Sequence, residues 1–128
     1  MKTVAFFGSS TFAGKGQAFN ILAFLQKQNK NLVFKNLGSG GDTAFKALQR
    51  IDDVVKAKPC ITFLLLGGND VLVNVLPMYR DAFRSLILGW SPDKIGERNG
   101  WKFHSDGIHL NSRGAMILIN LIDKYLQN

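Results

Sequence analysis

Three apolar runs that each end at a glycine-rich turn place the strongest constraint on the fold of this 128-residue chain. The runs cover residues 3–7, 32–34 and 61–66. The turns that follow them begin at Gly8, Gly38 and Gly67. A continuous apolar run bounded by turn residues is typical of a strand that is buried on both faces of a parallel sheet. The pattern therefore predicts three parallel strands, each followed by a glycine-rich turn.

Amphipathic segments separate these runs. Ala18, Ile21, Leu22 and Leu25 recur at helical spacing, which predicts a helix that ends near Asn29–Asn31. A second helix is expected after Asp42, whose side chain is suited to an N-cap, and it should stop before Pro59. Its apolar stripe consists of Ala44, Ala47, Leu48, Ile51, Val54 and Val55.

Alternation of strand and helix predicts an α/β fold, in which a parallel sheet is joined by right-handed crossovers. In such a sheet all three glycine turns lie at the carboxyl edge, where ligands bind. One strand–helix–strand unit takes roughly 30 residues. Residues 71–105 are too few for two more units and contain no β-rich run. We therefore expect a sheet reduced to about three or four strands.

The C-terminal half has a different pattern. Tyr79 to Leu86 carries a helical apolar stripe, residues 89–100 have the polarity of a loop, and Trp101–Phe103 suits a short extended piece. A closing amphipathic helix is predicted from Ala115, Leu118, Ile119, Ile122, Tyr125 and Leu126. The length fits a single domain over residues 1–128, and no internal repeat or linker interrupts it.

Composition narrows the function classes. The net charge is +7, but the basic residues are scattered, so a nucleic-acid arm or a basic membrane helix is not indicated. A solvated basic surface is the simpler interpretation, and attraction to an anionic substrate or membrane surface is the alternative. The longest apolar stretch, Ile61–Leu66, is far below the ~20 residues of a membrane span.

One cysteine and the N-terminal sequence bear on the compartment. Cys60 precedes an apolar run and is expected to be a buried core thiol, and it has no second cysteine to pair with. The apolar run at the start is too short for a secretory signal and leads directly into a glycine turn. These features predict a cytoplasmic protein.

The turns also carry residues that suit nucleophilic catalysis. Ser10 follows the first strand, and a nucleophilic serine needs a rigid turn and a nearby base. Asp106 and His109 stand three residues apart, and a carboxylate can orient the imidazole that acts as the base. His104 is a weaker alternative base. The backbone N–H of Gly41 and the side-chain amide of Asn69 could stabilise an oxyanion.

Four segments together resemble the SGNH hydrolases, which are also called the GDSL esterase/lipase family. The resemblance covers both ends of the chain, with the four blocks in the family's order. The blocks are Phe7-Gly8-Ser9-Ser10-Thr11, Asn36-Leu37-Gly38-Ser39-Gly40-Gly41-Asp42-Thr43, Gly67-Gly68-Asn69-Asp70 and Asp106-Gly107-Ile108-His109-Leu110-Asn111.

This resemblance implies a three-layer, flavodoxin-like sandwich and a serine hydrolase that cleaves carboxylic esters or thioesters through an acyl-enzyme. It implies that Ser10 is the nucleophile, that His109 is the base and that Asp106 orients His109. The oxyanion hole would consist of the N–H groups of Ser10 and Gly41 and the side chain of Asn69. A small-molecule ester is the implied substrate, and neither a metal nor a cofactor is implied.

The chain departs from the family's pattern in two respects. Ser9 stands where the family usually has Asp, which affects the geometry of the turn more than the chemistry. Asn69 and His109 are only 40 positions apart, which indicates a shortened member of the family, with the shortening expected near Val71 to Pro77. A natural deletion, an engineered deletion and missing residues are the alternative origins of the short segment. A catalytically impaired scaffold that binds a small acyl or carbohydrate ligand therefore remains the alternative. The edge of the third strand could also pair with a second copy, which would make a homodimer.

A phosphate- or nucleotide-binding α/β domain is the third interpretation. It draws on glycine turns at helix starts and on the positive charge. The chain contains no G-x-x-x-x-G-K-[ST] sequence, which a P-loop would require.

Overall fold

The computed structural model describes residues 1–14, 17, 19–70 and 110–127. The elements predicted over residues 79–103 lie outside these ranges, and so do Asp106 and His109.

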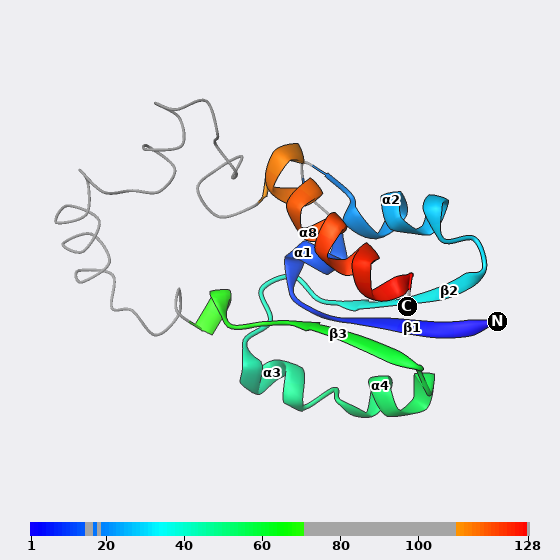
Figure 1. Cartoon of the computed structure of the whole chain (residues 1–128). Helices are drawn as coiled ribbons and strands as arrows, with labels where there is room; N and C mark the ends of the chain where they lie inside the picture. Colours follow the sequence, from blue (N-terminus) through cyan, green and yellow to red (C-terminus); the bar gives the residue numbers. More distant parts are fainter. Residues whose placement is uncertain (15–16, 18, 71–109, 128) are drawn as a thin grey trace, which may run out of the picture.

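The described part of the chain is built on a parallel sheet. Its strands are β1 (Lys2–Gly8), β2 (Leu32–Gly38) and β3 (Ile61–Leu65), in the order β2-β1-β3. Gly8 lies opposite Gly38 of β2 and opposite Leu65 of β3, so the three strands end at the same level. The predicted three-stranded parallel core is thereby confirmed, with its turns on one edge (Figure 1).

Helices cover both faces of the sheet. The first face carries α1 (Ser10–Ala13), α2 (Ile21–Gln28) and α8 (Ser112–Leu126), and the second carries α3 (Ala44–Leu48) and α4 (Asp52–Ala57) (Figure 1). This arrangement confirms the predicted three-layer α/β sandwich. Among the helices within the described ranges, none is both long enough and apolar enough to cross a membrane.

Phenylalanine rings form the centre of the core. Phe6 of β1 is fully buried, and its ring centroid lies 4.8 Å from that of Phe34 in β2 and 5.3 Å from that of Phe63 in β3. Phe12 of α1 meets the same ring edge-on at 5.4 Å. Leu25 of α2 and Ile119 of α8 belong to the same cluster. The first layer of helices therefore packs on the sheet through one continuous apolar cluster.

The second helix of the sequence prediction differs from the structure. A turn over residues 49–51 separates α3 from α4, so the predicted continuous helix is wrong. The N-cap of α3 is Thr43, whose hydroxyl accepts a hydrogen bond from the N–H of Lys46 at 3.3 Å, and not Asp42. Asp42 is instead drawn into an ion pair with Arg50. Both residue types suit a cap, and the tertiary contact decides between them.

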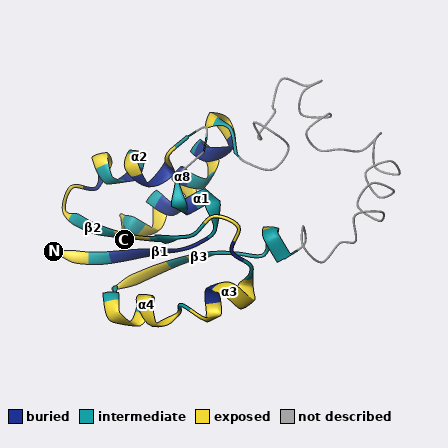
Figure 2. Cartoon of the chain, turned by 180° about the vertical axis from the view of Figure 1, so that it is seen from behind, coloured by how far each residue is buried: buried dark blue, intermediate teal, exposed yellow. Residues whose placement is uncertain are grey.

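Several predicted core positions are exposed (Figure 2). In the stripe of the second helix only Ala47 is buried, and Leu48 and Val55 are about two-thirds exposed, at 65% and 67%. Tyr125 of α8 is also exposed. The prediction that these large side chains belong to the core is therefore wrong for the described part of the chain.

The prediction that Cys60 is a buried thiol is also wrong, because its side chain is exposed. Cys60 lies at the amino end of the sheet, one residue before β3 begins. Its backbone N–H donates to the carbonyl of Thr3 at 2.8 Å, and its thiol contacts the same oxygen at 3.1 Å. The thiol therefore lies at the sheet edge remote from the glycine turns.

Candidate active site

Ser10 stands at the carboxyl end of β1 and is the first residue of α1. It is partly buried. Ser9 occupies the N-cap position but makes no capping hydrogen bond with its side chain. Helix α1 ends after a single turn, at Gly14, whose φ of 79° is left-handed. This short helix holds Ser10 at the sheet edge, with its N–H among the first-turn donors that lack a partner within the helix.

Close contact with β2 fixes the position of α1. A Cβ atom on Gly38 would fall on the backbone of Phe12 and Ala13, so only glycine allows the helix to approach. The amide of Asn36 donates to the carbonyl of Ala13 at 3.4 Å, and its oxygen accepts from the N–H of Gly38 at 2.9 Å. The backbone of Ser10 is therefore held by a rigid element.

The second glycine turn is tied to the first. The N–H of Ser39 donates to the carbonyl of Gly8 at 2.9 Å, and the N–H of Asp42 closes the turn onto the carbonyl of Ser39 at 3.3 Å. Gly41 has a φ of 76°, at the position where a type II turn requires a positive φ. The sequence uses glycine here for its backbone conformation, because a Cβ would meet open space.

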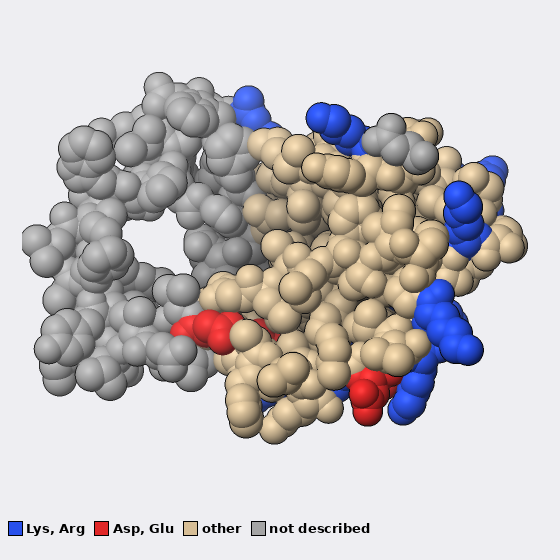
Figure 3. All heavy atoms as spheres, turned by 60° about the horizontal axis from the view of Figure 1, so that its bottom comes forward, with Lys and Arg blue, Asp and Glu red and all other residues tan. Residues whose placement is uncertain are grey.

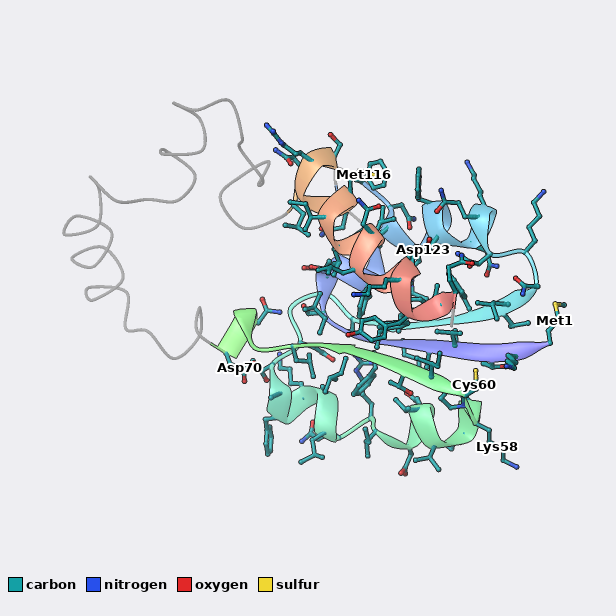
Figure 4. The ribbon with its side chains drawn as sticks, viewed as in Figure 1. Met1, Lys58, Cys60, Asp70, Met116 and Asp123 are labelled. Carbon is teal, nitrogen blue, oxygen red and sulfur yellow. The ribbon has the colours of Figure 1, made fainter. Side chains whose placement is uncertain are left out.

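The third turn is tied to the second. Gly67 has a φ of 111°, and the side-chain amide of Asn69 then donates to the carbonyl of Asp42 at 2.9 Å. Both carboxylate oxygens of Asp70 accept from the N–H of Ala44 at 3.0 Å. Figure 4 shows Asp70 beside the start of α3. Asn69 is thus brought next to the turn that contains Gly41.

Arg50 connects the same turns and was missed by the sequence analysis. Its Nε donates to Oδ2 of Asp42 at 2.6 Å, Nη1 donates to the carbonyl of Leu37 at 2.8 Å, and Nη2 donates to the carbonyl of Gly8 at 3.0 Å. Its guanidinium lies 4.7 Å from the centroid of the Phe7 ring. The sequence did not indicate this role, because Arg50 stands in a segment that was predicted as one continuous amphipathic helix. Only the break between α3 and α4 directs its side chain at the sheet.

A groove of about 410 Å³ opens between the end of β3 and α8. Ser9, Thr11 and Gly68 contribute to one part of its wall, and most of the remainder is aliphatic. The other lining residues are Leu65, Leu66, Leu110, Gly114, Ile117, Leu118 and Leu121. Turns one and three therefore border a largely apolar hollow.

Charge around the site is not concentrated. Figure 3 shows Lys and Arg side chains along the top and the right-hand border of the visible face, and acidic side chains in two places, one of them beside a basic group. Within residues 1–14, 17, 19–70 and 110–127, no group of three or more His, Cys, Asp or Glu side chains is placed to hold a metal ion.

Of the predicted site residues, Ser10, Gly41 and Asn69 lie in three turns at one edge of the sheet, linked by the hydrogen bonds above. Asp106 and His109 are outside the described residues. Leu110, the residue that follows His109, lines the same groove as Ser9. Asn111 then begins α8, where its side chain accepts from the N–H of Gly114 at 3.0 Å.

Comparison with solved structures finds the same fold in esterases. The structure of a lipase/acylhydrolase from Enterococcus faecalis has a TM-score of 0.68 at 17% identity, with 98% of this chain and 95% of that chain covered. The psychrotrophic esterase EstA from Pseudoalteromonas sp., in a structure inhibited by monoethylphosphonate, has a TM-score of 0.61 at 20% identity, with all of both chains covered.

AlinE4, an SGNH-hydrolase family esterase, is 28% identical with a TM-score of 0.52. That match covers 78% of this chain and 55% of AlinE4. These solved structures confirm the resemblance to the SGNH hydrolases. The sequence matches no protein-family model and no curated protein.

Proposed function

We propose that this chain, which has the fold of the SGNH hydrolases, hydrolyses carboxylic esters or thioesters with Ser10 as the nucleophile. One observation carries the proposal: three turns, far apart in sequence, converge at the carboxyl edge of the sheet. The N–H of Ser39 bonds to Gly8, and the amide of Asn69 bonds to Asp42. A nucleophile and its oxyanion donors need such a rigid common frame.

The proposed reaction has two steps. In the first, the hydroxyl of Ser10 attacks the ester carbonyl and transfers its proton to His109, which Asp106 orients. The protonated His109 then gives this proton to the leaving alcohol or thiol, and an acyl-enzyme remains. In the second step His109 takes a proton from water, which attacks the acyl group. Release of the acid returns the proton to Ser10, so no cofactor is consumed.

The proposed oxyanion hole consists of the N–H groups of Ser10 and Gly41 and the amide of Asn69. The hydrogen bond between Asn69 and the carbonyl of Asp42 supports this role, because it orients the amide. A side-chain amide has two N–H donors, so one can hold the turn while the other faces the substrate.

The groove supports an ester with an apolar acyl group. Ser9, the neighbour of Ser10, lines the groove together with Leu65, Leu118 and Leu121. An aliphatic chain in this groove would be removed from water, which contributes about 0.8 kcal/mol per buried methylene.

A catalytically impaired scaffold that binds a small ligand is the second candidate. Ser9 favours it, because its side chain makes no capping hydrogen bond to α1, whereas the family's usual Asp would suit that position. If the turn is weakened in this way, Ser9→Asp should raise the hydrolysis rate. A protein that binds fatty acids but hydrolyses no ester in either form would support the scaffold.

Replacement of Ser10 provides the test of the enzyme. Ser10→Ala should reduce the hydrolysis of p-nitrophenyl esters by at least about 10³-fold, because the nucleophile is lost. Ser112→Ala, at an exposed position of α8 that does not line the groove, is the control and should stay within a few-fold of the wild type. Equal activity of the Ser10→Ala variant and the wild type would refute the proposal.

A further inference from the structure

We infer that Arg50 is a positioning residue of the hydrolytic site, because its guanidinium holds the first and second turns together, next to the donors of Ser10 and Gly41, and is linked to Asn69 through Asp42. This inference rests on the proposed function. It assigns a role to a residue that lies outside the four blocks by which the family is recognised.

Each donor group of Arg50 reaches a different part of the frame. Nη2 holds the carbonyl of Gly8, two residues before Ser10, and Nη1 holds the carbonyl of Leu37 at the end of β2. Nε holds the carboxylate of Asp42, the residue after Gly41. The guanidinium is rigid and planar, so it fixes the spacing of the three acceptors relative to one another.

Asn69 is connected to the same network. Its amide donates to the carbonyl of Asp42, whose carboxylate is held by Arg50. Arg50 is therefore linked to Asn69 through Asp42. It also hydrogen-bonds directly to Asp42, beside Gly41, and to Gly8, near Ser10.

The surroundings of the ion pair strengthen it. The side chain of Arg50 is 24% exposed and that of Asp42 is 10% exposed, so the pair is largely shielded from water. Phe7, which is 3% exposed, lies under the guanidinium and limits its movement. A charge-assisted hydrogen bond in such a place is stronger and more directional than one at the surface.

Loss of this anchor should affect the transition state more than substrate binding. Oxyanion donors act on charge that develops during the reaction, so their displacement lowers kcat while KM changes little. Losing one donor outright costs about 10²–10³ in rate, and a misplacement of about 1 Å can cost about 10². We therefore expect a 10- to 100-fold decrease in kcat when Arg50 is replaced.

Arg50→Met keeps the length of the side chain and removes all of its donors. Arg50→Lys retains the charge beside Asp42 but cannot hold both strand carbonyls in the same fork. We expect kcat for a p-nitrophenyl ester to fall in both variants, by less in Arg50→Lys, with KM within about threefold of the wild type. The rate of Ser10 labelling by a fluorophosphonate should fall in parallel.

A stability-matched control separates positioning from general destabilisation. Leu25→Ala removes a fully buried side chain from the opposite layer, so it should lower the urea midpoint while leaving kcat unchanged at low temperature. A folded Arg50→Lys or Arg50→Met variant whose kcat equals that of the wild type would overturn the inference. If Arg50→Met does not fold, Arg50→Lys decides. A wild type that hydrolyses nothing and takes up no probe contradicts the proposed function itself, and the inference with it.

Discussion

Two glycines in the second block have opposite surroundings. A Cβ on Gly38 would fall on the backbone of α1, whereas a Cβ on Gly40, two residues later, would meet nothing within 4 Å. Gly40 also has no left-handed φ. Glycine is therefore required at position 38 for packing and at Gly41 for its backbone conformation, and Gly40 has neither requirement.

Gly38→Ala should lower the free energy of unfolding by roughly 1–3 kcal/mol or more, because α1 must move away from β2. Gly40→Ala is the matched control and should change it by less than about 0.5 kcal/mol. Urea unfolding followed by circular dichroism measures both. Equal stability of the two variants would mean that α1 does not pack on β2 as described.

Helices α2 and α8 are joined by one buried polar residue in addition to their apolar contacts. Asn29 is 4% exposed, and its amide donates to the carbonyl of Leu25 at 3.0 Å and to the carboxylate of Asp123 at 3.2 Å. The amide thus donates to a carbonyl in the last turn of α2 and links this helix to α8. The carbonyl of Leu25 also accepts from the backbone N–H of Asn29, so removal of the amide loses two hydrogen bonds without leaving that carbonyl unpaired, and the two bonds together contribute about 1–3 kcal/mol.

Asn29→Ala should therefore destabilise the protein by about that amount, whereas Asn120→Ala, at an exposed position of α8, should have little effect. A double-mutant cycle with Asp123→Ala isolates the contact between the helices. A coupling energy of zero would show that Asn29 acts only within α2.

The groove between β3 and α8 makes a prediction about substrate length. Leu121 lines the groove and is partly open to solvent, so Leu121→Trp should fill it. Relative to acetyl esters, kcat/KM for octanoyl esters should fall by about 10-fold or more, since a few methylenes lose their burial. Asn120→Trp, on a residue that does not line the groove, should leave the profile unchanged. An unaltered preference in Leu121→Trp would place the acyl group elsewhere.

At the scale of the whole molecule, local patterns were sufficient to predict the order of strands and turns. Apolar runs that stop at glycine mark both the end of each strand and the edge where the site lies, so Ser10, Gly41 and Asn69 could be placed together. Arg50 could not be predicted, because its role depends on a break between α3 and α4 that follows from tertiary contacts. The burial of Leu48, Val55 and Cys60 was also predicted wrongly, because periodicity shows which side of an element is apolar but not whether another element covers that side.

The proposal of a single domain over residues 1–128 can be tested with the two tryptophans. Trp90 and Trp101 lie in the sequence between β3 and α8, whereas far-ultraviolet circular dichroism reports mainly the helices and sheet. One domain predicts that fluorescence and circular dichroism follow the same urea transition. Two separate midpoints would show that the central segment unfolds independently.

The reactivity of Ser10 is the property on which the proposed chemistry depends. The native protein should be treated with a fluorophosphonate, digested, and mapped by tandem mass spectrometry, with urea-unfolded protein as the control. We predict a single adduct on Ser10 of the native protein, and none on Ser9 or on the unfolded chain. Native, folded protein without an adduct at Ser10, or with equal labelling after unfolding, would contradict the assignment of a serine nucleophile at this edge of the sheet.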